Sequence, residues 1–193
     1  KEYGSLLNVE SYDWELLGRF VESSNTEGQI SFDTYGLEET VEKLKRLIRI
    51  GKVMAQKYEV VVTNPSYAGT SNLSAKVNNF VKKNYPDSKA DLFAVFIERC
   101  GEMLKKNGYQ AMITQHSWMF IGSFEKLRNK MLNCNLINMV HLGIKAFEEI
   151  GNDVVQTCSF IYQKNKKNNY LTKFVRLVEY KSYSEKPKEF FNP

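Results

Sequence analysis

Apart from Glu59, residues 58–63 form a short run of β-branched and aromatic side chains that stops abruptly at Asn64-Pro65. Three consecutive valines, at 60–62, leave no polar alternation, which is typical of a strand buried on both faces of a parallel sheet. Proline lacks a backbone N–H and cannot continue such a strand. The run therefore predicts a parallel-sheet strand with a defined end, and this restricts the fold to α/β architectures.

The rest of the chain alternates between helical and extended patterns. Asp91 is expected to cap a helix that Asn107-Gly108 ends. Hydrophobic periodicity predicts helices over 37–56, 91–106 and 124–132, strands over 109–114, 136–142 and 154–163, and a further strand of a hairpin over 170–180. This order predicts an α/β sheet with crossover helices.

Composition narrows the class of protein. The 193 residues, 42% hydrophobic and 25% charged, suffice for a folded domain with a sizeable core. No window approaches the roughly 20 apolar residues that span a bilayer, so we expect no membrane partner. The three cysteines are widely separated and form no Cys-x-x-Cys pair, so we expect neither disulfides nor a metal site, and a reducing cytoplasm as the location. The net charge of +5 is compatible with a polyanionic partner but does not establish one.

The loop after the 58–63 strand reads Asn64-Pro65-Ser66-Tyr67. In open α/β sheets, ligands bind beyond the carboxyl ends of the strands, where this loop is delivered. The Asn64 amide oxygen and a backbone carbonyl fixed by Pro65 can together hold a planar amine, whose lone pair then becomes more available. Tyr67 offers a flat face for an extruded base. An ordinary Asn-Pro turn with a buried tyrosine is the alternative.

This loop is one of six blocks whose order resembles the second half of the catalytic domain of N6-adenine-specific DNA methyltransferases. In that family, a strand ends in Asn-Pro-Pro-Tyr, and the next helix begins with Asp/Asn-Leu-Tyr/Phe. A strand that ends near a Trp follows, then a helix, and then a strand that carries Leu-Gly and a Phe. The matching blocks are 60–67, 91–96, 108–118, 124–128, 141–147 and 154–161. The likeness is greatest to the large methyltransferases of bacteriophage-exclusion (BREX) systems, the PglX type, and to fused restriction–modification enzymes.

The resemblance implies a partial Rossmann-like class I methyltransferase sheet, its target-base half, with an antiparallel terminal strand. It also implies roles for single residues. Asn64 and the Pro65 carbonyl would hold the adenine amine as catalytic groups, and Tyr67 would stack on the flipped ring. Phe147 takes the place of the second base-contacting aromatic, although core packing is an alternative. Ser66 stands beside the base at a position where proline is usual. Serine constrains the loop backbone less than proline, so tuned or weakened activity is expected.

The resemblance further implies S-adenosylmethionine as the cofactor. Phe96 matches an aromatic position near the cofactor adenine, and Asp91 is a second candidate contact; core packing competes for Phe96. No Gly-x-Gly or Asp-Pro-x-x-Gly turn occurs in the chain. We therefore expect the main cofactor motif outside this chain, which would be an inactive fragment by itself. Without that half, the 58–63 strand would expose an edge.

Three regions are expected: a lead-in segment over 1–57, the target-base half over 58–165, and a connection toward a recognition domain over 166–193. The expected function is site-specific N6-methylation of a flipped adenine in double-stranded DNA, with other defence-system subunits as further candidate partners. His116 is expected at the mouth of the loops, where it could contact DNA phosphate. Two alternatives stay open: protein glutamine N5-methylation, and a catalytically inactive DNA-binding or assembly module of phage defence.

Overall fold

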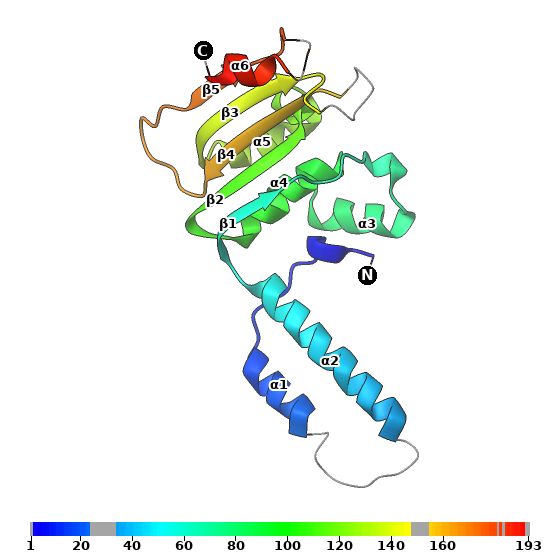
Figure 1. Cartoon of the computed structure of the whole chain (residues 1–193). Coiled ribbons are helices and arrows are strands. Elements are labelled where there is room, and N and C mark those ends of the chain that lie inside the picture. The colour runs from blue at the N-terminus through cyan, green and yellow to red at the C-terminus, as the bar shows by residue number, and fades with distance from the viewer. Residues whose placement is uncertain (1, 24–33, 148–154, 181, 183, 192–193) are drawn as a thin grey trace. The chain divides into compact units, whose positions relative to one another are not determined.

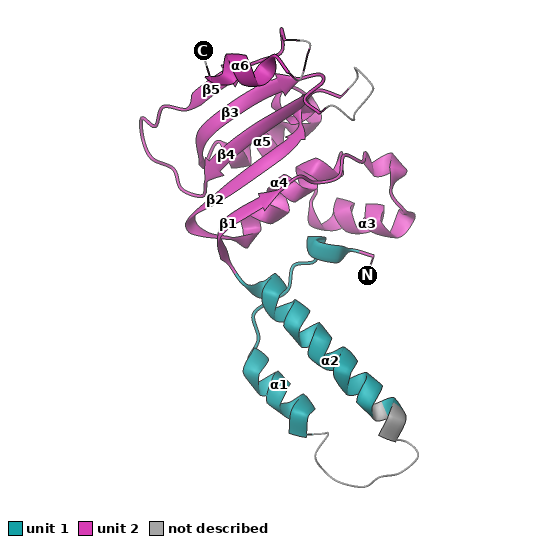
Figure 2. Cartoon of the chain, viewed as in Figure 1, with its two compact units in different colours: residues 1, 3–56 teal, residues 2, 57–193 magenta. Residues whose placement is uncertain are grey.

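The computed structural model describes residues 2–23, 34–147, 155–180, 182 and 184–191. The chain divides into two compact units, which Figure 2 distinguishes by colour. One unit comprises residues 3–56, and the other comprises residues 57–193 together with Glu2. None of the helices in the described ranges has the length and apolar character needed to span a bilayer.

The first unit is helical. A short 3-10 helix, η1 (Gly4–Leu6), precedes α1 (Trp14–Ser23) and the long α2 (Thr34–Ala55). α1 packs alongside α2 (Figure 1), and the Trp14 ring lies so close to Gly51 that a Cβ there would meet it at 2.8 Å. The predicted helix over 37–56 is confirmed within a few residues, whereas α1 was missed because its aromatic residues did not suggest a helical stripe.

The second unit contains a five-stranded sheet in the order β1-β2-β4-β3-β5. β1 pairs parallel with β2, and β5 pairs parallel with β3. β4 runs antiparallel between β2 and β3. The strands are β1 (Tyr58–Thr63), β2 (Leu104–Gln115), β3 (Asn135–Gly143), β4 (Thr157–Gln163) and β5 (Lys173–Arg176). The predicted α/β class is confirmed. The expected antiparallel terminal strand is corrected in position: the antiparallel strand is β4, inside the sheet, and the last strand, β5, is parallel to β3.

Helices connect the parallel strands as crossovers (Figure 1). Between β1 and β2 lie η2 (Thr70–Asn72), α3 (Ala75–Asn84) and α4 (Leu92–Met103); between β2 and β3 lie η3 (His116–Met119), η4 (Gly122–Phe124) and α5 (Glu125–Met131); α6 (Lys186–Phe191) follows β5. Because β1, β2 and β3 all point the same way, their carboxyl ends meet at one edge of the sheet.

The core forms where α4 and α5 pack on one face of the sheet. Phe93 and Ile97 of α4 meet Leu127 of α5 and the strand residues Met112 and Phe160, all at most 2% exposed. Each such side chain contributes about 1.5–3 kcal/mol by leaving water. The apolar side chains spaced along one face of α4 and those on the facing side of the strands thus form a single hydrophobic layer.

The predicted end of the 91–106 helix is wrong. α4 ends at Met103, and Leu104 begins β2 with its side chain 2% exposed in the core. The pairing jumps from Tyr58–Leu104 to Val60–Tyr109, so four residues bulge opposite Glu59. The backbone N–H of Asn107, at φ 67°, donates to the carbonyl of Lys164 over 3.1 Å. Long-range pairing and burial therefore end the helix a turn early.

Two further strand predictions need correction. β1 is not buried on both faces: Val60 is 57% exposed and Val62 71%, and β1 lies at the sheet edge, with β2 as its single strand partner among the described residues. This agrees with the expectation of an exposed edge. The segment 170–180 forms no hairpin, because β5 pairs parallel with β3. β4 begins at Thr157, and residue 154, the predicted start, lies outside the described residues.

Candidate active site

The Asn64–Tyr67 loop leaves β1 at the carboxyl edge of the sheet, as predicted. Asn64 and Ser66 are exposed, Pro65 is buried, and Tyr67 is half-buried. The Tyr67 hydroxyl donates to Asn64 Oδ1 over 3.4 Å. The Tyr67 ring meets Phe93 edge-on, with ring centroids 6.2 Å apart and planes at 85°. The loop thus places the accessible Asn64 amide beside the Tyr67 ring, which packs against Phe93 of the core.

Asp91 holds this loop against the start of α4. Its Oδ1 accepts from the backbone N–H of Ala68 over 3.1 Å and from that of Phe93 over 3.2 Å. The Leu92 N–H in turn donates to the Ala68 carbonyl over 3.0 Å. Burial raises the pKa of the Asp91 carboxyl, against the lowering effect of these N–H donors. The predicted N-cap is confirmed, and the same oxygen also accepts a hydrogen bond from Ala68 at the end of the Asn64–Tyr67 loop.

The state of the Tyr67 phenol follows from its burial. Desolvation, with the Cys158 thiol nearby, raises the pKa of Tyr67 to about 12. The phenol is therefore protonated near neutral pH and acts as a donor toward Asn64 Oδ1. A carbonyl oxygen has two lone pairs, so the Asn64 amide retains acceptor capacity while it receives this bond.

Two further predicted site residues, Phe96 and Phe147, lie on different elements. Phe96 is partly exposed on α4 and packs against the core cluster. Phe147 is partly buried in the loop after β3, four residues beyond Gly143, whose φ is +71°. Direct contacts join Asn64 to Tyr67, and Asp91 to the end of their loop; the base and cofactor roles of Ser66, Phe147, Phe96 and Asp91 stay predictions.

Sequence reasoning missed a histidine pair at this edge. His116 Nδ1 and His141 Nε2 lie 2.9 Å apart, and the Phe120 ring packs against both imidazoles. Burial lowers the pKa of His116; burial followed by the charges of His116, Arg176 and Lys186 lowers that of His141. Both rings are thus neutral at pH 7, one donating to the other. The available signal was that each histidine lies near the end of a strand.

The sheet has an antiparallel strand between two parallel ones, and an Asn-Pro-x-Tyr loop lies at the carboxyl end of β1. The chain matches the Eco57I restriction-modification methylase family over residues 7–147, and it belongs to that family. The predicted resemblance to restriction–modification methyltransferases is thereby confirmed.

Two curated relatives match nearly the whole chain. The adenine-specific methyltransferase PglX of Lacticaseibacillus casei (strain Zhang) is 44% identical over 192 residues, which are 98% of this chain and 16% of that protein. The adenine-specific methyltransferase BrxX of Escherichia coli O9:H4 (strain HS) is 38% identical over 183 residues, 93% of this chain and 15% of that protein. The chain therefore spans about a sixth of the length of these relatives.

A solved structure shares the fold at low sequence identity. In its complex with DNA, DrdV superposes with a TM-score of 0.57 and 15% identity, over 80% of this chain and 18% of that chain.

Proposed function

We propose that this chain is the target-base half of a DNA adenine-N6 methyltransferase of a phage-defence or restriction–modification system. The observation that carries the proposal is the exposed Asn64 amide beside the braced Tyr67 ring at the carboxyl end of β1. The names of the relatives PglX and BrxX support adenine as the substrate over protein glutamine, the second planar amine that such a loop suits. Both relatives are named as enzymes, and this also disfavours the alternative of a catalytically inactive DNA-binding or assembly module.

In the proposed reaction, a flipped adenine stacks on Tyr67, and its amine donates one N–H to Asn64 Oδ1 and the other to the Pro65 carbonyl. Two acceptors placed on one nitrogen favour a tetrahedral amine, which frees the lone pair from the ring. When bound, S-adenosylmethionine would supply the methyl group. The N–CH3 bond would form as the sulfonium S–CH3 bond breaks, S-adenosylhomocysteine would leave, and one amine proton would be lost to solvent. Ser66 and Phe147 are proposed as further contacts to the base.

Two residues of this chain are candidate contacts for the cofactor. Phe96 keeps an exposed portion on α4 and is the proposed contact for the cofactor adenine. Asp91 already accepts two backbone N–H groups through Oδ1, so any cofactor contact would use its other oxygen. The outer edge of β1, which has no strand partner among the described residues, is proposed as the contact surface for the half that carries the main cofactor motif.

The partners proposed for the full-length enzyme are double-stranded DNA and other subunits of the defence system. The position of Ser66 makes the loop less constrained than one with two prolines, because serine has a free φ. We accordingly propose an active but tunable loop, in which Ser66→Pro would raise the methylation rate or leave it unchanged.

The test uses the full-length enzyme and a DNA substrate with one target adenine. Asn64→Ala removes the amine acceptor and is expected to lower single-turnover methyl transfer at least a hundredfold, while binding of S-adenosylmethionine by calorimetry stays near wild type. Asn72→Ala, at an exposed asparagine in η2, is the matched control and should leave both unchanged. Wild-type transfer by Asn64→Ala would refute the mechanism, and transfer to a glutamine peptide in preference to DNA would favour the alternative.

A further inference from the structure

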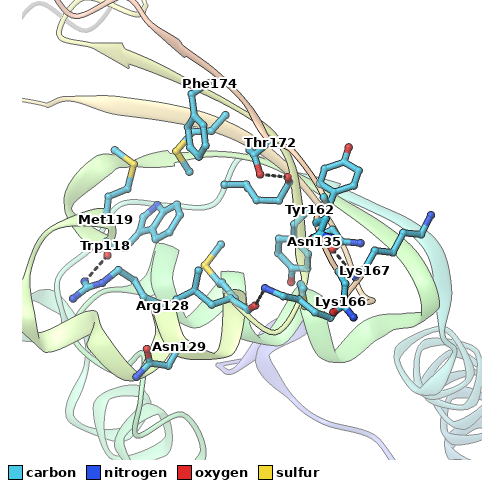
Figure 3. A pocket seen from close by; sticks show the side chains of 18 residues that line it. Trp118, Met119, Arg128, Asn129, Asn135, Tyr162, Lys166, Lys167, Thr172 and Phe174 are labelled. Carbon is cyan, nitrogen blue, oxygen red and sulfur yellow. Dashed lines mark hydrogen bonds between the residues drawn. The ribbon is translucent and has the colours of Figure 1, made fainter.

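A concave region lies away from the Asn64–Tyr67 loop, beside α5. A pocket of about 760 Å³ opens between α5, the strands β3 and β5, and the loop that joins β4 to β5. No residue of the Asn64–Tyr67 loop is among the described residues that line it. Figure 3 shows its side chains arranged around an open centre, with Trp118 and Met119 on one side and Asn135, Tyr162 and Lys167 on the other. The volume is in the range of small-molecule sites, about 300–1,000 Å³.

One wall of this pocket is aromatic and rich in methionine. Trp118 is 5% exposed and Met139 6%, so both lie deep in this wall, whereas Phe174 is 66% exposed and lies at the rim of the pocket. The Trp118 ring is held in place because its Nε1–H donates to Thr114 Oγ1 over 3.1 Å. Flat aromatic faces and polarisable thioethers are surfaces on which a planar ring packs well.

The polar part of the lining is positively charged. Arg128, Lys166 and Lys167 line the pocket, and no aspartate or glutamate is found among its described lining residues. Arg128 Nη1 donates to the carbonyls of Trp118 and Ile121, each over 2.7 Å, and Lys166 Nζ donates to that of Leu132 over 2.5 Å. These bonds to neutral carbonyls position the cations without neutralising them, so the pocket favours an anion.

Asn135 adds a specific hydrogen-bonding group. The residue is 3% exposed, and its Oδ1 accepts from the backbone N–H of Lys167 over 2.8 Å, which settles the orientation of the amide. Its Nδ2 is buried and has no hydrogen-bond partner among the described residues. A buried donor without an acceptor is unfavourable, so an acceptor atom on a ligand would be stabilised there.

We propose that this pocket is a binding site for a nucleoside phosphate. The base packs on the Trp118 and methionine wall, a ring nitrogen or carbonyl accepts from Asn135 Nδ2, and the phosphate lies near Lys166 and Lys167. The three features come from different elements and point to one ligand chemistry. An acyl anion would offer no flat face to Trp118, and inorganic phosphate would leave the aromatic wall unused. The proposal does not depend on the methyltransferase function.

The experiment titrates the isotope-labelled 193-residue chain with adenosine 5′-monophosphate, adenosine or inorganic phosphate, and follows the Trp118 indole and Asn135 side-chain amide signals by NMR. We expect the monophosphate to shift both signals and to bind at least tenfold more tightly than either of its parts. Absence of a shift at millimolar monophosphate, or equal affinity for phosphate alone, would overturn the proposal.

Two pairs of matched variants locate the site. Replacing Lys166 and Lys167 together by Ala should reduce the affinity to that of adenosine, while the same change at the exposed pair Lys82-Lys83 on α3 should not. Phe174→Glu should weaken binding at least tenfold, whereas Phe191→Glu, at a likewise exposed ring (76% against 66%) outside this pocket, should have no effect. Equal effects of the site and control variants would show general charge attraction and refute the site.

Discussion

Asp91 Oδ1 lies 3.1 Å from the backbone nitrogen of Ala68, at the end of the Asn64–Tyr67 loop, and 3.2 Å from that of Phe93, in the first turn of α4. One carboxylate oxygen therefore serves as the helix N-cap and as the clamp of the loop. The stability of α4 and the position of Tyr67 are coupled through it, because the Tyr67 ring rests on Phe93 in the same turn.

Asp91→Ala should destabilise the chain by about 0.5–2 kcal/mol, the usual cost of a lost N-cap. Asp91→Asn keeps an oxygen at the accepting position and should cost less than half as much. Urea unfolding followed by circular dichroism measures both. If Asp91→Ala is as stable as wild type, the clamp contributes nothing and the coupling is refuted.

Gly108 allows β1 and β2 to approach each other at the bulge. A Cβ at this position would meet the backbone carbonyl oxygens of Glu59 at 2.9 Å and Tyr58 at 3.1 Å. Gly108→Ala should therefore cost about 1–3 kcal/mol, as overpacked sites do. Gly122→Ala is the control, since a Cβ there would meet nothing within 4 Å. A thermal unfolding midpoint lowered equally by both would contradict the crowding.

The His116–His141 pair makes stability depend on pH. Both pKa values are lowered from the ordinary value of 6.5, so the unfolded chain binds protons more readily than the folded one. The stabilisation is present above pH 6.5 and is lost as pH falls toward the lowered folded pKa values. Urea unfolding at pH 7.5 and 5.5 should show a larger loss for wild type than for the double variant His116→Gln, His141→Gln. Equal losses would rule the pair out as the cause.

The Tyr67 phenol should lose its proton at a higher pH than an ordinary tyrosine. With its pKa raised to about 12, the folded chain holds this proton above the ordinary pKa of 10.0, so its stabilisation is lost as pH rises from 10 toward 12. Tyrosinate absorbance near 295 nm is the readout, and the difference between wild type and Tyr67→Phe should rise near pH 12. A difference curve centred at pH 10 would mean that Tyr67 is not desolvated.

Tyr67 also allows a test of base stacking in the full-length enzyme. Tyr67→Ala should weaken binding of DNA with a mismatched target adenine by about 1–3 kcal/mol, the typical contribution of one base–aromatic stack. Tyr67→Phe keeps the ring and should retain most of the affinity. A competition gel-shift at fixed salt distinguishes them; equal losses for both variants would assign the effect to the hydroxyl and contradict stacking.

Features with local causes could be predicted from the sequence. The end of β1 at Thr63 follows from Asn64-Pro65, because proline cannot donate to a ladder, and the start of α4 follows from the capping side chain of Asp91. The order of helices and strands was also readable, since each carries its own hydrophobic period. The candidate loop belongs to this group, because its residues are adjacent in the chain.

Features that depend on distant partners were not predictable in this way. Helix-forming residues continue to Lys106, yet the helix ends at Met103 because burial of Leu104 and pairing with β1 and the Lys164 segment compete with it. Likewise, β5 pairs parallel with β3 because β3 offers a free edge, and the residues of β5 by themselves do not indicate this partner.

By itself, then, the sequence determined the α/β class, the loop at Asn64–Tyr67 and the family resemblance, because turn chemistry, capping and periodicity act over a few residues. Tertiary structure alone decided that Asp91 clamps this loop, that His116 meets His141 across 25 residues, and that β1 leaves Val60 and Val62 uncovered. Those outcomes depend on which segments become neighbours, and that choice is made by burial and backbone pairing over the whole sheet.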